Sequence, residues 1–175
     1  MTVFEPGREI AVLAEADVLV PTVTDSIDAE LDRFHRYNQP FSLIFFDLDR
    51  FKDINDRYGH EAGDKVLKAI AGRINEILRK PDIFARYGGE EFVVILPETR
   101  LKQGLNVAAK LRQEIEDAVF EYEDKRVPVT ISLGITEVRE TDRHYRVIVN
   151  RADSYMYRAK EQGRNRIISD LDMPK

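Results

Sequence analysis

The chain has 175 residues, of which 43% are hydrophobic and 34% charged, a composition typical of one globular domain with a full core. It contains no cysteine, and its three histidines are scattered singly, which excludes disulfides and thiolate metal sites and argues against a zinc enzyme. The net charge of −5 argues against non-specific binding to nucleic acid polymers. The longest mainly apolar stretch, residues 10–20, is interrupted by acidic residues, so we expect a cytoplasmic protein without membrane insertion by this segment.

Residues 1–22 contain a short helix-like stretch, Glu9 to Val18, and we expect a linker or the stub of a signalling helix there. The domain is expected to span 23–170, followed by a tail over 171–175. Apolar residues at helical spacing predict its first helix over 25–37, which Pro40 ends.

Residues 41–46 form an apolar run of strand length, which ends at Asp47-Leu48-Asp49. If the strand continues, both aspartates lie on one side at its end. A helical stripe covers 61–78, and two runs rich in β-formers, 83–87 and 92–96, flank Gly88-Gly89. This pattern predicts a hairpin whose two-residue loop is Gly88-Gly89.

The remaining elements are predicted as a helix over 105–119, a strand over 127–138, a helix over 145–161 and a short strand over 166–169. Helices alternate with strands and with one true hairpin. This order favours an α+β fold, a central and mostly antiparallel sheet wrapped by helices.

Acidic residues follow the first long strand and start the second hairpin strand, where Glu90 and Glu91 stand. For either segment alone, a solvated acidic turn is the preferred interpretation. Together, oxygen ligands without histidine or thiol select Mg²⁺ or Mn²⁺. The spacing of residues 47–58 excludes an EF-hand, and that of residues 59–65 excludes a Walker-type loop.

Cations and polar side chains near these acidic segments fit a nucleotide. Lys52 offers a positive charge to phosphate oxygens, and Asn55 and Asp64 carry groups that can read the edge of guanine. Lys160 and Arg164 end the last helix, where they either complement its dipole or neutralise a triphosphate.

Over about residues 24–170 the chain resembles the GGDEF-domain diguanylate cyclases. The residues that carry this resemblance are Asp47-Leu48-Asp49, Phe51-Lys52, Asn55-Asp56, Gly59-His60, Gly63-Asp64, Gly88-Gly89-Glu90-Glu91-Phe92 (a GGEEF variant), Thr130-Ile131-Ser132, Gly134, Arg151-Ala152-Asp153, Tyr157, Ala159-Lys160 and Gly163-Arg164-Asn165. The resemblance implies a fold like the palm of nucleotidyl cyclases, with a ferredoxin-like core. It also implies condensation of two GTP molecules into cyclic di-GMP with release of two pyrophosphates.

Carried over to this sequence, the resemblance implies roles for individual residues. Asp47, the carbonyl of Leu48 and Glu90 would bind two Mg²⁺ or Mn²⁺ ions per half-site, and Glu90 or Glu91 would accept the proton of the 3′-hydroxyl. The residues expected to hold GTP are Lys52, Asn55, Asp64, Gly88, Gly89, Lys160 and Arg164, with Lys52 also acting in catalysis. Each domain would hold one GTP, so catalysis would need a homodimer.

Arg79-Lys80-Pro81-Asp82 has the Arg-x-x-Asp pattern of the family's product-inhibition site, at the family's distance from the glycines. The alternative is a helix-terminal arginine before a proline turn. Lys110 stands where the family has a second inhibitory arginine, and it lacks the bidentate guanidinium. The family's N-terminal motif is poorly kept here, with Asp17 as the expected partner of Arg86.

Three other functions fit parts of the pattern. A catalytically inactive member would bind GTP or cyclic di-GMP as a receptor, although this chain keeps Asp47, Gly88, Gly89, Glu90 and Glu91. A cyclase for mixed guanine–adenine products would lose the carboxylate that stands here as Asp64. A partner-binding module would leave the clustered carboxylates and cations unexplained.

Overall fold

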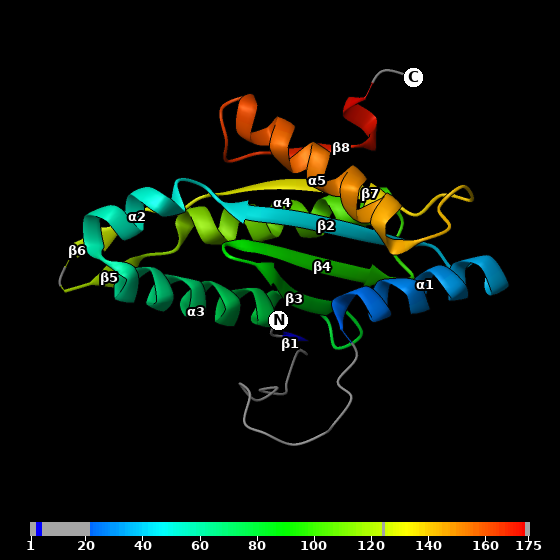
Figure 1. Cartoon of the computed structure of the whole chain (residues 1–175), viewed down its shortest axis with the longest axis horizontal. Helices are drawn as coiled ribbons and strands as arrows, with labels where there is room; N and C mark the ends of the chain where they lie inside the picture. Colours follow the sequence, from blue (N-terminus) through cyan, green and yellow to red (C-terminus); the bar gives the residue numbers. More distant parts are fainter. Residues whose placement is uncertain (1–2, 5–21, 124, 174–175) are drawn as a thin grey trace.

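The computed structural model describes residues 3–4, 22–123 and 125–173 (Figure 1). The helix expected over Glu9 to Val18 and the Asp17 side of the expected contact with Arg86 lie outside these residues. Among the described helices, none combines the length and the apolar character needed to cross a bilayer.

The core is a six-stranded sheet with the strand order β1-β3-β4-β2-β7-β8, in which β4 and β2 are central (Figure 1). All neighbours are antiparallel except the parallel pair β7 and β8, so the predicted α+β fold with a mostly antiparallel sheet is confirmed. The strands span Val3–Phe4 (β1), Phe41–Leu48 (β2), Ile83–Gly88 (β3), Glu91–Pro97 (β4), Ile131–Glu137 (β7) and Ile167–Ser169 (β8). Phe120–Tyr122 (β5) and Lys125–Val127 (β6) pair separately.

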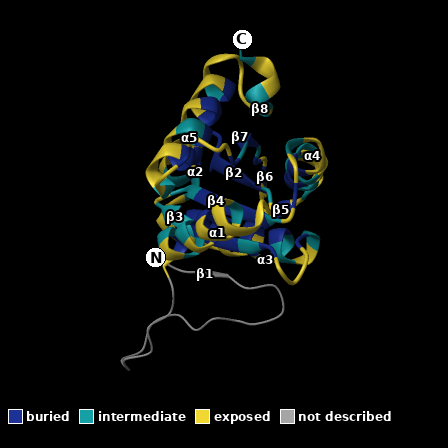
Figure 2. Cartoon of the chain, turned by 90° about the vertical axis from the view of Figure 1, so that its right-hand side faces the viewer, coloured by how far each residue is buried: buried dark blue, intermediate teal, exposed yellow. Residues whose placement is uncertain are grey.

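Helices cover both faces of this sheet. They span Val23–Tyr37 (α1), Phe51–Tyr58 (α2), His60–Ile77 (α3), Leu101–Asp117 (α4) and Tyr145–Glu161 (α5), and a short 3₁₀ turn covers Asp170–Asp172 (η1). Leu43 and Phe45 of β2 pack with α1 and α5, whereas Ile44 and Phe46 pack with α3 and α4. This alternation buries both faces of β2, and Figure 2 shows α5 and α4 on opposite sides of it.

A close approach of α5 to β7 fixes the position of the last helix. A Cβ atom added to Gly134 of β7 would lie 1.9 Å from the carbonyl oxygen of Ala152 and 2.5 Å from the backbone nitrogen of Met156. Only glycine permits this contact. The contact holds α5 directly on the sheet, and with it the side chains that α5 brings to the end of β2.

Two elements differ from the sequence-based expectation. Residues 51–58 form α2, a separate helix whose buried Phe51 and Ile54 were not recognised as a helical pattern because charged residues surround them. The strand expected over 127–138 is divided between β6 and β7, because Pro128 cannot donate to a strand ladder. At the C-terminus, Met173 packs against a small cluster of Tyr155, Ala159 and Ile168.

Candidate active site

The turn that carries Glu90 lies one residue further along the chain than predicted. β3 ends at Gly88, which pairs with Glu91, so the two loop residues are Gly89 and Glu90. A register shift between Arg86 and Gly88 adds one residue to β3, and this bulge moves the turn. The Nε–H of Arg86 donates a hydrogen bond of 2.6 Å to the carbonyl oxygen of Gly89 and closes the loop.

Asp47 lies at the end of β2, between Glu91 on β4 and Ser132 on β7. Its residue exposure is only 5%. The Nζ of Lys160 contacts Oδ2 of Asp47 at 2.8 Å, whereas Oδ1 is buried and has no hydrogen-bond partner in the described chain. Burial raises the pKa of Asp47 to about 6 against the opposing effect of Lys160, and the charges of Glu90 and Glu91 add to the rise.

This unpartnered oxygen makes the end of β2 suitable for a cation. The backbone N–H of Leu48 donates to the carbonyl oxygen of Glu90 at 3.4 Å, which holds the hairpin tip against Asp47. In the described ranges no three Asp, Glu or His side chains gather closely enough to hold a metal ion. The unpartnered oxygen of Asp47 has the chemistry that a hard cation such as Mg²⁺ prefers, and Glu90 stands in the adjacent turn.

Asp153 of α5 joins this group, although the sequence analysis gave it no role. Burial raises the pKa of Glu91, and the charge of Asp153 contributes next. Burial also raises the pKa of Asp153, while Lys160 lowers it. The carboxylates of Glu91 and Asp153 thus lie near enough to the Lys160 ammonium group for its charge to lower the pKa of both. Glu91 is too far from Asp153 in the sequence for their proximity to be predicted. The proximity of Asp153 and Lys160 could have been predicted, because they are two helical turns apart on one face of α5.

Asp49 has a positioning role rather than a free carboxylate. Its oxygens accept hydrogen bonds from Thr130 Oγ1 at 2.7 Å, Ser132 Oγ at 2.6 Å and the backbone N–H of Asn165 at 3.0 Å. These bonds join β2, β7 and the turn after α5. Thr130 and Ser132 are two residues apart, so an extended backbone points both hydroxyl groups to the same side. This spacing was the signal in the sequence that the two residues could bind one carboxylate.

The residues predicted to bind guanine are neighbours on α2 and α3. A Cβ atom added to Gly63 would lie 2.0 Å from the side-chain oxygen of Asn55, so this amide packs directly on the α3 backbone. Asp64 follows Gly63 and is exposed, and Lys52 is exposed one turn before Asn55. The structure therefore places Asn55 against the α3 backbone one residue before Asp64.

The two predicted phosphate ligands at the end of α5 differ in position. Lys160 forms the ion pair with Asp47 described above. Arg164 is exposed in the turn that follows α5, has a left-handed backbone with φ of 63°, and forms no ion pair within the described residues. It lines a cavity together with Asp49 and Asn165 rather than contacting Asp47.

The predicted inhibition site forms a compact unit just beyond α3. Asp82 is 2% exposed, and its oxygens accept bonds from Arg79: Nη2 at 2.8 Å, Nε at 3.3 Å and the backbone N–H at 2.8 Å. Arg79 Nη2 also donates to Thr99 Oγ1 at 3.0 Å. Hydrogen bonding to Asp82 raises the pKa of Arg79. Asp82 thus orients an arginine whose side chain remains 57% exposed, while Lys110 is exposed on α4.

Comparisons with known proteins agree with this geometry. The family model "Diguanylate cyclase, GGDEF domain" matches residues 22–166. The diguanylate cyclase DgcP of Pseudomonas aeruginosa is 42% identical over 145 residues, which cover 83% of this chain and 22% of DgcP. The matched region spans 22% to 37% of the length of five curated relatives.

Solved structures give the same result. The active GGEEF domain of a diguanylate cyclase from Vibrio cholerae superposes with a TM-score of 0.78 at 31% identity, over 83% of this chain and 92% of that one. The GGDEF domain of DgcB from Caulobacter crescentus, solved in complex with c-di-GMP, gives a TM-score of 0.81 at 26% identity, over 90% and 98% of the two chains. The chain belongs to the GGDEF domain family of diguanylate cyclases.

Proposed function

We propose that this domain is a catalytically competent diguanylate cyclase, which condenses two GTP molecules into cyclic di-GMP. The observation that carries the proposal is Asp47, a buried carboxylate with one unpartnered oxygen beside the Glu90 turn. A buried carboxylate whose pKa rises to about 6 costs stability at neutral pH, and a bound cation would offset that cost. A buried carboxylate oxygen without a hydrogen-bond partner is expected at a ligand site rather than in a structural core.

One GTP molecule would lie between the α2–α3 pair and the end of β2. Asn55 and Asp64 would bind the guanine edge, because a carboxylate accepts from its N1 and N2 hydrogens. Lys52, Lys160 and Arg164 would hold the phosphates, and the Gly88-Gly89 backbone would approach them without side chains. Lys160 would exchange its contact with Asp47 for a phosphate oxygen.

In the reaction, the 3′-hydroxyl oxygen of each GTP attacks the α-phosphorus of the other. The bond from that phosphorus to the β-phosphate bridging oxygen breaks, and pyrophosphate leaves. Glu90 or Glu91 takes the hydroxyl proton, and Lys52 stabilises charge on the leaving phosphates. Mg²⁺ or Mn²⁺, two ions per half-site held by Asp47, Leu48 and Glu90, would supply Lewis-acid stabilisation of the phosphoryl oxygens.

Two copies of the domain must meet for this reaction, because each half-site holds one nucleotide. The exposure of Lys52, Asp64 and Gly89 fits a site that faces a partner rather than a closed pocket. A GTP substrate also fits a cytoplasmic location.

Product inhibition is part of the proposal. Arg79, oriented by Asp82 and Thr99, presents its guanidinium to solvent and would bind a phosphate or the Hoogsteen edge of guanine in cyclic di-GMP. Asp82 itself is buried and already accepts from Arg79, so its role would be to position the arginine. Lys110 would add a single charged contact.

Incubation of the protein with GTP and Mg²⁺, followed by chromatography, tests the proposal. We expect cyclic di-GMP and two equivalents of pyrophosphate, with a specific activity that rises with protein concentration. No product at any concentration, including with two domains linked to force dimers, would refute catalysis. GTP or cyclic di-GMP binding without turnover would then identify a receptor.

A further inference from the structure

A cavity of about 540 Å³ lies behind α2, between that helix, the β6–β7 loop and the turn after α5. This volume lies in the range of small-molecule sites. The residues that line the cavity are Asp49, Arg50, Asp53, Ile54, Arg57, Tyr58, Val127, Pro128, Thr130, Gly163, Arg164 and Asn165. Apart from Arg164, none of them belongs to the proposed GTP site.

The cavity and the guanine residues lie on opposite faces of α2. Asp53 and Arg57 line the cavity, and they are one helical turn apart on one face. Asn55 stands midway between them in sequence, about 200° around the helix from each, and it packs on Gly63 of α3. A ligand in the cavity therefore cannot be the guanine that Asn55 and Asp64 would bind.

The cavity wall carries three arginines and two aspartates, a small excess of positive charge in a chain whose net charge is −5. Arg50, Arg57 and Arg164 form no ion pair with any described residue. The oxygens of Asp49 accept three hydrogen bonds from neutral groups, so this carboxylate keeps its charge but is held in place, and Asp53 is the second acidic lining residue. Guanidinium groups without carboxylate partners are suited to phosphate oxygens.

The rest of the wall offers surface for an aromatic ring. Ile54 is buried, Val127 is buried, and Pro128 and Tyr58 are at least partly exposed toward the cavity. The guanidinium carbon of Arg57 lies 5.2 Å from the centre of the Tyr58 ring. Stacked tyrosine and arginine faces bind nucleobases.

The backbone of the wall is held in an uncommon conformation before any ligand binds. Arg50, Gly163, Arg164 and Asn165 all have positive φ, at 56°, 113°, 63° and 47°. The side chain of Asn165 accepts from Arg112 at 2.9 Å and donates to Glu116 at 2.7 Å, which fixes the turn on α4. The cavity is thus formed in advance, which lowers the entropy cost of binding.

We propose that this cavity is a second nucleotide site, which takes a purine nucleoside diphosphate or triphosphate. The phosphates would lie between Arg50 and Arg164, and the base would stack by Arg57 and Tyr58 with Asp53 as an acceptor for its amino or imino hydrogens. Because Arg164 is shared, occupancy would withdraw a phosphate ligand from the proposed GTP half-site. The site would therefore lower the affinity of the half-site for GTP.

Calorimetric titration of the full chain with GDP tests the proposal. We expect two GDP molecules per chain. Arg57→Ala should weaken one of the two binding events at least tenfold and should tighten the other, because the cavity no longer competes for Arg164. Arg50→Gly should do the same, since glycine adopts the positive φ of this position without strain. Arg36→Ala is the matched control, because Arg36 is exposed at the end of α1 and forms no described ion pair.

Two further titrations separate the sites and the ligand class. Asp64→Asn should weaken only the GDP-binding event that survives in Arg57→Ala. If Asp64→Asn weakens neither event, the assignment of the GTP half-site is wrong, and the result for the cavity still stands. Inorganic pyrophosphate should bind the cavity at least tenfold more weakly than GDP. A single GDP per chain, an Arg57→Ala titration identical to that of Arg36→Ala, or equal affinity for pyrophosphate and GDP would each overturn the proposal.

Discussion

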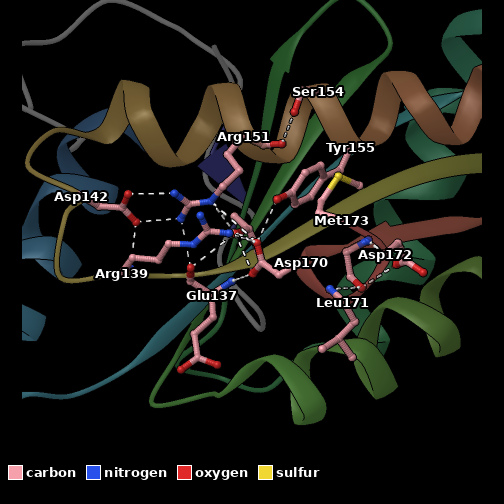
Figure 3. Close-up of polar contacts among 12 residues, drawn as sticks. Glu137, Arg139, Asp142, Arg151, Ser154, Tyr155, Asp170, Leu171, Asp172 and Met173 are labelled. Atoms are coloured by element: carbon pink, nitrogen blue, oxygen red, sulfur yellow. Dashed lines mark hydrogen bonds and ion pairs between the residues drawn. The ribbon is translucent and has the colours of Figure 1, made fainter. Parts of the chain in front are cut away.

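Two buried aspartates at opposite ends of the sheet have opposite environments. Asp142, beyond the end of β7, is fully buried, and its two oxygens accept from Arg151 at 2.8 and 2.7 Å and from the N–H of Arg139 at 2.9 Å (Figure 3). Burial opposes its ionisation, but these hydrogen bonds hold the pKa of Asp142 below its usual value. Asp47 has one bonded oxygen, one bare oxygen and a raised pKa.

The two environments suit different roles: the hydrogen bonds of Asp142 stabilise the fold, whereas the unpartnered oxygen of Asp47 suits the proposed ligand site. At the Asp142 end a second carboxylate, Asp170, accepts from Thr136, from Tyr155 and from the N–H of Glu137, so β7, α5 and η1 are tied together (Figure 3). Every buried charge there has its partners within the chain. At the Asp47 end the oxygen Oδ1 of Asp47 has no hydrogen-bond partner among the described residues, which is the gap that the proposed ligand would fill.

Glu90→Gln should have the largest effect of these substitutions. It should lower activity through the Asp47 end of the sheet and leave the Asp142 end unchanged. We expect cyclic di-GMP synthesis to fall about 10³-fold, because a carboxylate that binds metal and accepts a proton becomes a neutral amide. The free energy of unfolding should change by less than about 0.5 kcal/mol, since Glu90 lies in a turn. Glu76→Gln, at an exposed position of α3, is the control. Normal turnover by Glu90→Gln would disprove the metal assignment.

Arg151→Ala should have the next largest effect, at the other end. It leaves Asp142 buried without its bidentate partner and should lower the free energy of unfolding by about 3 kcal/mol in urea denaturation. Arg143→Ala removes an exposed arginine from the preceding loop and should change it by well under 1 kcal/mol. Equal losses in the two variants would mean that the Asp142 network adds nothing to stability.

Asp47→Asn should stabilise the protein while it abolishes activity. Because the folded pKa of about 6 lies above the ordinary aspartate value of 3.8, Asp47 favours the folded state below pH 3.8, and that contribution is lost as the pH rises through 6. The pKa of about 6 already includes the opposing effect of Lys160, so the variant should exceed the wild type by about 2 kcal/mol at pH 7 and match it near pH 4.

Thermal melts at the two pH values measure this difference. Addition of Mg²⁺ should reduce the difference in stability between Asp47→Asn and the wild type, because Mg²⁺ should stabilise only the wild type. A variant less stable than the wild type at pH 7 would show that the Lys160 contact outweighs the burial of Asp47.

Arg79→Ala should have the smallest effect. Arg79 belongs neither to the Asp47 end nor to the Asp142 end of the sheet. It should raise the cyclic di-GMP concentration for half-inhibition about tenfold, about 1.4 kcal/mol, without lowering the uninhibited rate. Lys80→Ala, one residue along and also exposed, is the control. Inhibition curves that coincide for the two variants would place the feedback site elsewhere.

Periodicity predicted the larger elements of this fold well. The helix over Tyr145–Glu161 and the strand over Phe41–Leu48 follow from the distribution of apolar side chains, since their buried stretches are long and regular. α2 was missed because eight residues with only two buried positions give too short a pattern. The turn at Gly89 was misplaced by one residue because a bulge has no signature in composition.

The site was predictable in its residue types but not in its pairings. Spacing and resemblance indicated Asp47, Glu90 and Lys160, yet the contact of Lys160 with Asp47 joins residues more than 100 positions apart. The saturation of Asp49 depends on three separate segments that only the folded sheet brings together. The same is true of the cavity behind α2.

The close packing of α5 on Gly134 also leaves Lys160 as the flexible group beside Asp47. With the backbone of α5 lying directly on β7, rotation about the side-chain bonds of Lys160 is enough to release its contact with Asp47. Such rotamer changes take picoseconds to nanoseconds, whereas two proteins meet far more slowly at cellular concentrations. In the function proposed above, the rearrangement of Lys160 would therefore be fast, and the encounter of two chains would govern the rate of synthesis.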